Sequence, residues 1–363
     1  MIPTKGYAAQ TAGDTLAPYN FERRTPGPHD VHIEILFCGV CHTDIHFLNN
    51  DWGISLYPMV PGHEIVGKVI AVGDHVKKFK AGDTAGVGCL VDSCRDCENC
   101  NDGLEQHCLN GAVYTYSGME KDGVTITKGG YSTAIVVDER FVLKIPSNLS
   151  PEKAAPLLCA GITTYSPLKQ WNVGKGQKVA IVGLGGLGHM AVKFAASFGA
   201  DVTVLSTHTS KKDDALKLGA HHFVVTTDEE QTKSVTGKFD FILDTLSAPH
   251  DYNLYLSLLK TGGKLICVGL PTVPMEVPAF NIVFTRKCIA GSLIGGLPET
   301  QEMIDYCAAN NITADVEVIS IQQINDAYKR MIASDVKYRF VIDVSSLRKV
   351  EAALEERKEP AGA

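Results

Sequence analysis

Residues 178–188 read KVAIVGLGGLG, a short apolar strand pattern followed at once by glycines in the order G-x-G-x-x-G. Gly183 permits a tight turn, Gly185 lets the backbone approach a pyrophosphate, and Gly188 lets the next helix pack against the sheet. The unpaired N–H groups at the N-terminus of that helix attract anions. Because the motif lies between a strand and a helix, it predicts a dinucleotide-binding turn; an ordinary glycine-rich turn is the alternative.

The chain around this turn has two textures. After about residue 151, strand and helix patterns alternate, which predicts an α/β domain with a doubly wound parallel sheet. The expected strands there are 178–182, 202–205, 223–225, 239–243 and 264–268, with helices at 187–198 and 211–218. From Val31 to about Lys144, runs broken by Gly and Pro predict an irregular β-rich domain with strands at 31–37, 65–72, 131–137 and 141–145. A helix at 300–310 and a strand at 336–342 are expected to return to that first domain.

The end of the second strand indicates which dinucleotide binds. An NAD site usually has an acid about twenty residues after the glycines, but Asp201 lies at the wrong end of the strand. Ser206, Thr207 and Lys211 instead supply hydroxyls and a positive charge that suit a 2′-phosphate. We therefore predict NADP(H); the alternative is that Lys211 and Lys212 are only the solvated first turn of a helix.

Length and charge narrow the class of protein. A chain of 363 residues favours two domains, and a net charge of −7 gives no reason to expect nucleic acid or a membrane surface. Neither an apolar run of about eighteen residues nor a signal-peptide pattern is visible. Without an export signal, the eleven cysteines favour a cytoplasmic protein with metal ligands and reduced thiols.

Four cysteines form a dense C-x2-C-x2-C-x7-C run: Cys94, Cys97, Cys100 and Cys108. Four thiolates at such spacing are typical of a closed structural zinc site. A zinc-ribbon interaction module would explain this run alone, but it would leave the glycine turn without a role.

A sparse set predicts a second zinc site. Cys41, His63 and Cys159 offer two thiolates and one imidazole, and three protein ligands leave an open position for chemistry. Glu64 is a candidate transient ligand, and Asp44 is a candidate to orient a ligand. Taken singly, each cysteine has a simpler interpretation as a buried apolar residue. We expect that simpler role for the other five, which are Cys38, Cys89, Cys267, Cys288 and Cys307.

Four segments together resemble the zinc-dependent medium-chain alcohol dehydrogenases: Cys41–His46, Pro61–Glu64, Cys94–Cys108 and Gly183–Gly188. Leu157–Tyr165 and Ser206–Lys211 are similar to the cinnamyl alcohol dehydrogenase branch, which includes bacterial aldehyde reductases. The resemblance covers about residues 5–345. It implies a GroES-like catalytic domain (1–157 and 296–345), a Rossmann NADP-binding domain (158–295) and a tail (346–363).

The resemblance also implies roles for single residues. Thr43 and His46 match the family's proton relay, which passes a proton from the bound alcohol to the Thr43 hydroxyl and on to His46 and water. The implied NADP(H) contacts are Thr43, Thr163, Gly183, Leu184, Gly185, Gly186, Leu187, Gly188, Ser206, Thr207, Lys211, Thr245, Gly269, Ser292, Leu293 and Ile294.

The substrate pocket departs from the plant lignin enzymes of this branch. Their tryptophan after the last structural cysteine and their phenylalanine after the serine correspond here to Val113 and Leu293. The expected apolar wall consists of Trp52, Met59, Cys89, Leu90, Val113, Leu293 and Ile294. Because an apolar pocket discriminates weakly, by about 1–3 kcal/mol per methylene, we expect broad aldehyde specificity.

The sequence thus predicts an NADP(H)-dependent zinc alcohol dehydrogenase that mainly reduces aldehydes. The alternatives are a polyol or sugar dehydrogenase of the same superfamily and a nucleotide-sensing protein that has lost its chemistry. The resemblance implies a homodimer that pairs near Ala290–Gly295. Leu347, Val350 and Leu354 have helical spacing, so the tail is either a short amphipathic helix or a remnant of an expression vector.

Overall fold

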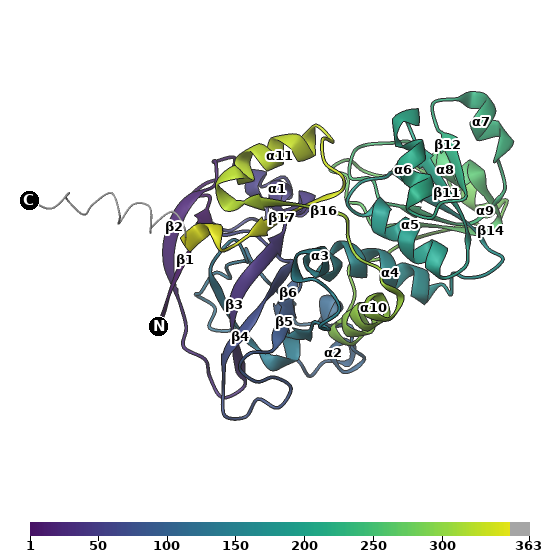
Figure 1. Ribbon diagram of the computed structural model, residues 1–363. Helices are drawn as coiled ribbons and strands as arrows, with labels where there is room; N and C mark the ends of the chain where they lie inside the picture. Colours follow the sequence, from purple (N-terminus) through teal and green to yellow (C-terminus); the bar gives the residue numbers. More distant parts are fainter. Residues whose placement is uncertain (349–363) are drawn as a thin grey trace, which may run out of the picture. The chain divides into compact units, whose positions relative to one another are not determined.

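The computed structural model describes residues 1–348, and the helix expected around Val350 and Leu354 lies outside them. The chain forms two compact units (Figure 1). Of the described residues, unit 1 contains Met1–Cys159 and 295–348, and unit 2 contains Ala160–Ile294. Among residues 1–348, no helix combines the length and the apolar character needed to cross a membrane.

Unit 2 is built on a six-stranded sheet in which all neighbouring strands are parallel. In spatial order its strands are β12 (His222–Val225), β11 (Asp201–Ser206), β10 (Lys178–Val182), β13 (Phe239–Asp244), β14 (Leu259–Cys267) and β15 (Cys288–Gly291). The helices are α4 (Ala160–Gln170), α5 (Gly188–Ser197), α6 (Lys212–Lys217), α7 (Glu229–Ser234), α8 (Tyr252–Leu258) and α9 (Phe280–Val283). The predicted doubly wound α/β fold is confirmed.

The centre of this sheet explains the position of the glycine turn. Val179–Val182 in β10 are at most 1% exposed, because β10 lies between β11 and β13. Gly183 follows with φ +85°, a conformation that residues with a Cβ rarely adopt. A Cβ on Gly188 would lie 2.1 Å from the carbonyl oxygen of Gly183, so only glycine lets α5 begin this close to the turn.

Unit 1 is β-rich. Its seven-stranded sheet has the order β16 (Val316–Ser320), β17 (Arg339–Asp343), β3 (Asp30–Gly39), β4 (Ile65–Val72), β5 (Thr84–Val87) and β9 (Leu143–Lys144), with β8 (Ala134–Asp138) paired to β3. Two small sheets pair β1 (Ile2–Ala8) with β2 (Ala17–Arg23) and β6 (Leu90–Asp92) with β7 (Val113–Tyr114). The helices are α1 (His42–Asn49), α2 (Glu98–Asn101), α3 (Pro151–Ala154), α10 (Leu297–Asn310) and α11 (Ile324–Ile332).

Several expected elements have different bounds: the strands expected at 131–137 and 336–342 are β8 and β17, which begin three residues later, and two further cases show a physical reason. The strand expected at 141–145 is reduced to the two residues of β9, because a 3-10 turn, η2 (Glu139–Phe141), precedes it. The Asp138 carboxylate caps this turn by accepting the backbone N–H of Arg140 at 3.0 Å. The helix expected from residue 300 begins at Leu297, with Pro298 in its first turn, where a missing N–H costs nothing.

Candidate functional site

Four potential ligands from distant segments meet in unit 1. Ligand atoms of Cys41, His63, Glu64 and Cys159 all lie within 4.8 Å of one another, and all four residues are buried. Cys41 follows β3, and His63 and Glu64 precede β4. The antiparallel pairing of β3 with β4, which places Cys38 opposite Ile65, brings these two turns together. Cys159 comes directly after the 3-10 turn η3 (Ala155–Leu158).

The donor set fits zinc. Two thiolates and an imidazole are the nitrogen and sulfur ligands that zinc prefers. The Glu64 side chain adds a carboxylate whose Oε1 accepts a hydrogen bond from Arg339, whereas its buried Oε2 has no hydrogen-bond partner among the described residues. Burial raises the pKa of Glu64 to about 7, although the Arg339 guanidinium opposes this. A Cβ on Gly39 would lie 1.8 Å from Glu64 Oε2, so this glycine keeps the space that the carboxylate occupies.

The two thiols of this cluster affect each other's acidity. Hydrogen bonding by Cys159 lowers the pKa of Cys41, and the same contact raises the pKa of Cys159. Both thiols would have to be deprotonated to hold a metal ion. Cys89 belongs to the same environment, because hydrogen bonding with Cys159 also lowers the pKa of Cys89. Of the five cysteines expected in the core, Cys38 and Cys307 are buried, Cys89 and Cys267 are half-buried and Cys288 is exposed, so the prediction is wrong for Cys288.

A buried carboxylate joins the two ligand-bearing turns. Asp44 is 0% exposed, and its Oδ2 accepts the backbone N–H of Cys41 at 2.9 Å and the hydroxyl of Tyr131 at 3.1 Å. Its Oδ1 lies 3.3 Å from both the backbone nitrogen of Gly62 and Nδ1 of His63. Asp44 therefore fixes the orientation of the imidazole, as carboxylates beside metal-binding histidines commonly do.

Replacing Tyr131 with phenylalanine should loosen this cluster selectively. The change removes one donor to the buried Asp44 carboxylate, and such a loss costs about 1–3 kcal/mol. We expect a chelator to remove zinc from the Cys41–His63–Cys159 site about tenfold faster than from the wild-type protein, measured with a zinc-sensitive dye. The zinc of the four-cysteine site is the internal control and should leave at its wild-type rate. If zinc left the Cys41–His63–Cys159 site of the variant at the wild-type rate, that result would contradict the role assigned to Tyr131.

Helix α1 presents two polar groups beside Cys41. The Thr43 hydroxyl lies 3.5 Å from the Cys41 sulfur, and His46 follows one turn later on the same face. His46 Nδ1 lies 2.7 Å from Asp51 Oδ2, and its ring centroid lies 4.9 Å from that of Trp52. The sequence prediction did not include Asp51. Asp51 reaches His46 because Asn50, at the end of α1, has a left-handed backbone that turns the chain back.

The dense cysteine run forms a separate cluster. The sulfurs of Cys94, Cys97, Cys100 and Cys108 lie within 4.8 Å of one another. Backbone N–H groups point at these sulfurs: that of Cys94 donates to Cys108 at 3.3 Å and that of Cys97 to Cys94 at 3.4 Å. Backbone hydrogen bonds, first that of Leu109, lower the pKa of Cys97 to about 6. The pKa values of Cys94 and Cys100 are raised instead, so the convergence of the four sulfurs is what fits a closed zinc site.

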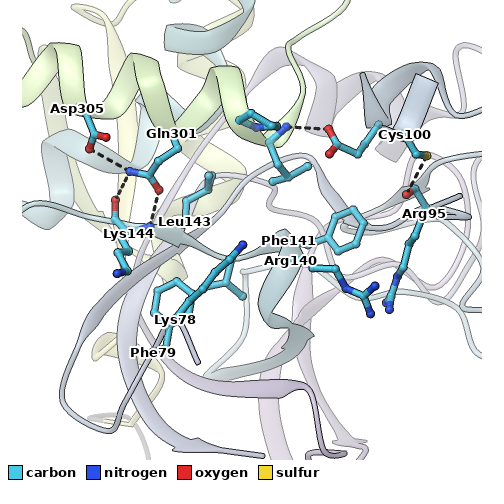
Figure 2. Close-up of a pocket in the computed structure, with 15 residues that line it drawn as sticks. Lys78, Phe79, Arg95, Cys100, Arg140, Phe141, Leu143, Lys144, Gln301 and Asp305 are labelled. Atoms are coloured by element: carbon cyan, nitrogen blue, oxygen red, sulfur yellow. Dashed lines mark hydrogen bonds between the residues drawn. The ribbon is translucent and has the colours of Figure 1, made fainter. Parts of the chain in front are cut away.

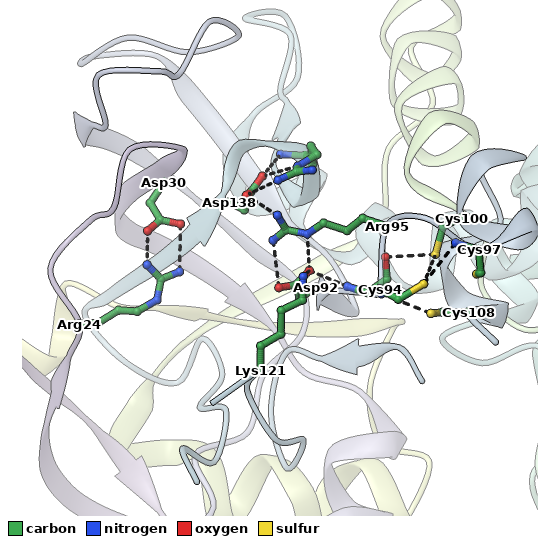
Figure 3. Close-up of polar contacts among 12 residues, drawn as sticks. Arg24, Asp30, Asp92, Cys94, Arg95, Cys97, Cys100, Cys108, Lys121 and Asp138 are labelled. Carbon is green, nitrogen blue, oxygen red and sulfur yellow. Dashed lines mark hydrogen bonds and ion pairs between the residues drawn. The ribbon is translucent and has the colours of Figure 1, made fainter. Parts of the chain in front are cut away.

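We call the segment Cys94–Cys108 the cysteine lobe. Ion pairs hold it against the rest of unit 1 (Figure 3). Arg95, which has a left-handed backbone, donates to both Asp92 oxygens at 2.7 and 2.9 Å and to Asp138 at 2.8 Å. Arg140 also donates to Asp138. Although burial opposes the shift, these guanidinium groups lower the pKa of Asp138 to about 2. These ion pairs fix the chain next to the cysteine cluster, which suits a structural role for the cluster.

A cavity of about 640 Å³ lies beside this lobe (Figure 2). Gln301 closes one side of it by accepting the Lys144 backbone N–H at 2.8 Å and donating to the Lys144 carbonyl at 3.1 Å. Cys100 is on its wall, but Cys41, His63 and Cys159 are not. Gln301 also donates to Asp305 at 3.1 Å, so it is held on both sides (Figure 2).

The expected cofactor residues of unit 2 lie at the carboxyl ends of its strands. Ser206 ends β11, Thr245 follows β13, Gly269 lies beyond β14, and Ser292–Ile294 follow β15. In parallel sheets this edge is where nucleotides bind. Lys211 donates from Nζ to the Leu184 carbonyl at 3.2 Å, so it reaches the glycine turn from the neighbouring strand. Thr163 is buried on α4.

The residues expected in the substrate pocket are divided between the two units and differ in burial. In unit 1, Trp52 lies on the His46 ring, and Met59 and Leu90 are buried. Val113 belongs to the β6–β7 pair, where Leu90 lies opposite Tyr114. In unit 2, Leu293 is 37% exposed and Ile294 is 9% exposed.

Comparison with known proteins gives the same outline. Residues 27–147 match the alcohol dehydrogenase GroES-like domain, and residues 186–309 match the zinc-binding dehydrogenase family. The chain is 55% identical to an NADP-dependent alcohol dehydrogenase C of Mycolicibacterium smegmatis over 349 residues, which is 96% of this chain and all of that protein.

Two solved structures are similar over nearly the whole chain. A cinnamyl alcohol dehydrogenase from Sorghum bicolor is 47% identical with a TM-score of 0.92, covering 94% of this chain and 98% of that one. The Helicobacter pylori cinnamyl alcohol dehydrogenase complexed with NADP(H) is 44% identical with a TM-score of 0.90, covering 95% and 99%.

Proposed function

The chain belongs to the zinc-dependent medium-chain alcohol dehydrogenases, and from this premise we propose how its residues carry out the reaction. It is an NADP-dependent alcohol oxidoreductase of the cinnamyl alcohol dehydrogenase branch, with one catalytic and one structural zinc. We further propose that it mainly reduces aldehydes of broad type. The observation that carries this proposal is the buried cluster of Cys41, His63, Glu64 and Cys159.

Cys41, His63 and Cys159 would hold the catalytic zinc. When bound, zinc polarises the carbonyl group of the substrate and NADPH provides the hydride. The protein's own part is to keep the ligand set in place: Asp44 orients His63, and the Arg339–Glu64 ion pair holds a carboxylate beside the ligands. Glu64 Oε2 is available as a further oxygen ligand because nothing else described binds it.

Thr43 and His46 would supply the proton that reduction of an aldehyde consumes. The Thr43 hydroxyl lies beside the Cys41 sulfur, and the His46 side chain is 20% exposed to solvent. Asp51 accepts a hydrogen bond from His46 Nδ1 and so favours one orientation of the ring, leaving Nε2 for proton exchange. The His46–Asp51 contact supports including Asp51 in the proposed relay.

A cofactor comparison tests this proposal. We expect wild-type enzyme to reduce aliphatic, benzylic and cinnamyl aldehydes with NADPH, and to use NADH poorly. Lys211→Ala should raise KM for NADPH about tenfold or more and leave KM for NADH unchanged, because it removes one charge-assisted contact to the 2′-phosphate. Lys212→Ala is the matched control, since Lys212 is the neighbouring exposed lysine.

Two outcomes of the comparison would count against the proposal. A strong preference of the wild-type enzyme for NADH would overturn the assignment of Ser206, Thr207 and Lys211. Oxidation of mannitol in preference to reduction of the aldehydes would favour the polyol dehydrogenase alternative.

We also propose a homodimer that pairs through β15. Strand β15 has β14 as its neighbour and is the edge of the described sheet. Apolar side chains nearby are exposed, including Phe280 at 65%, Val283 at 69% and Phe284 at 73%. An exposed edge strand beside such a patch is a typical pairing surface.

A cytoplasmic location is supported by the eleven cysteines, all of which are free thiols.

A further inference from the structure

A short loop of unit 2 lies directly against the glycine turn. β13 ends at Asp244, and the loop 245–250 leads to α8. The Thr245 hydroxyl donates to the Val182 carbonyl at 2.7 Å. A Cβ on Gly183 would lie 2.8 Å from Leu246 Cδ2, and a Cβ on Gly269 would lie 2.0 Å from the Leu246 carbonyl oxygen. The position of this loop therefore determines the shape of the turn.

His250 closes the loop onto its own origin. Its Nε2 lies 2.8 Å from Asp244 Oδ2, and the two side chains are only 9% and 2% exposed. Its Nδ1 lies 2.8 Å from the Ala248 carbonyl oxygen. The other Asp244 oxygen accepts the Leu246 backbone N–H at 3.1 Å. A carbonyl and a carboxylate both accept hydrogen bonds, so both ring nitrogens must carry hydrogen, and the ring is an imidazolium.

The groups that face this ring keep it charged. They are Asp251, which precedes α8, and Tyr252 and Tyr255 of α8, and from β14 Cys267 faces Asp244. Burial raises the pKa of Tyr252 and of Cys267 to about 12 each and raises that of Tyr255, so all three are neutral near pH 7. Although burial opposes protonation, the hydrogen bond to Asp244 raises the pKa of His250. Asp244 and Asp251 are the negative charges that face the imidazolium.

We propose that His250, in its imidazolium form, is a positioning residue for NADP(H), because it locks the loop 245–250 against the dinucleotide turn. The inference rests on the proposed function. It adds a residue that touches neither the cofactor motif nor the zinc ligands. Loss of the ring's charge removes one of its two donors and releases Ala248 or Asp244 from the contact. The loop then no longer holds Leu246 between Gly183 and Gly269.

The direction of the pH dependence follows from the raised pKa. A histidine whose pKa is raised by folding contributes its full stabilisation at low pH and loses it as pH rises through the raised value. NADPH affinity should therefore be highest near pH 6.5 and fall about tenfold on the alkaline side of neutrality.

The experiment is a titration of the zinc-loaded full chain with NADPH between pH 6.5 and 9.5, followed by the fluorescence of bound NADPH. His250→Gln is expected to bind about tenfold more weakly at pH 6.5, with an affinity that no longer changes with pH, and the kinetic loss should fall on KM for NADPH more than on kcat. The matched control is His222→Gln, which breaks another His–Asp pair of the same sheet, 3.1 Å long, at the amino end of β11. This control should behave as wild type.

A second measurement covers a variant that fails to fold. In wild-type protein labelled at histidine, the NMR signal that is absent from His250→Gln should titrate with the same midpoint as the NADPH affinity. Where that variant does not fold, His250→Asn assigns the signal. A midpoint that differs, or unchanged affinity in His250→Gln, would overturn the role of His250 while NADPH still binds. Failure of wild-type protein to bind NADPH at every pH would instead overturn the proposed function.

Discussion

Replacing Cys159 with alanine should leave a folded protein that holds one zinc ion per chain and has almost no turnover. Cys159 is one of two buried thiols in the cluster, and its hydrogen bonding lowers the pKa of Cys41. Without Cys159 the cluster loses the second thiolate of its Cys2His ligand set, and Cys41, His63 and the Glu64 carboxylate do not reproduce it. We expect kcat/KM for aldehydes to fall by about 10³-fold or more, a loss of about 4 kcal/mol in transition-state stabilisation.

The measurement combines zinc content, circular dichroism and steady-state kinetics. Cys307→Ala is the control, since Cys307 is also a fully buried thiol but lies on α10, outside both clusters. It should keep both zinc ions and its turnover, with a slight loss of stability from the small cavity that the substitution creates. Wild-type turnover in metal-replete Cys159→Ala would remove Cys159 from the catalytic site.

Replacing Cys100 with serine should act on stability first. Its sulfur lies 3.9 Å from that of Cys94 and 3.3 Å from the Ser93 hydroxyl, within a lobe whose only helical segments are short. Zinc binding at such a site contributes directly to folding. A loss of several kcal/mol corresponds to a Tm lower by about 10 °C, at about 2–4 °C per kcal/mol.

The outcome for Cys100→Ser is read from Tm, zinc content and activity together. Activity should fall only as far as the lobe unfolds at the assay temperature, so cooling should recover part of it. Cys288→Ser is the control, because Cys288 is exposed on β15 and belongs to neither cluster. An unchanged Tm with one zinc ion fewer would show that the four-cysteine site does not stabilise the fold.

Most of the fold was predictable because its signals are local. The glycine turn, the apolar run of β10 and the alternation that follows it depend on neighbours within a few residues, and each survives as an element of unit 2. The four-cysteine cluster was predictable for the same reason, since its ligands lie within fifteen residues. The bounds were less accurate at β9, where a side-chain cap from Asp138 competes with the strand.

The polar contacts around the site were not predictable in this way. Asp51 pairs with His46 only because Asn50 adopts a left-handed conformation, and Arg339 reaches Glu64 across 275 residues. No motif in the sequence singles out His250. The core assignment of Cys288 failed because the identity of a thiol does not specify which face of its strand is covered.

The sequence by itself determined the two metal-ligand sets, the nucleotide turn and the class of fold, because each is encoded by residue type at short spacing or by a resemblance carried on intact motifs. Only the tertiary structure decided how the sparse ligands are held: by the register of β3 on β4, by the fourfold contacts of Asp44, and by the space that Gly39 leaves for Glu64. The physical reason is that hydrogen bonds and desolvation depend on distances of about 3 Å between groups far apart in the chain. Those distances exist only after the sheet that contains β3 and β4 has formed.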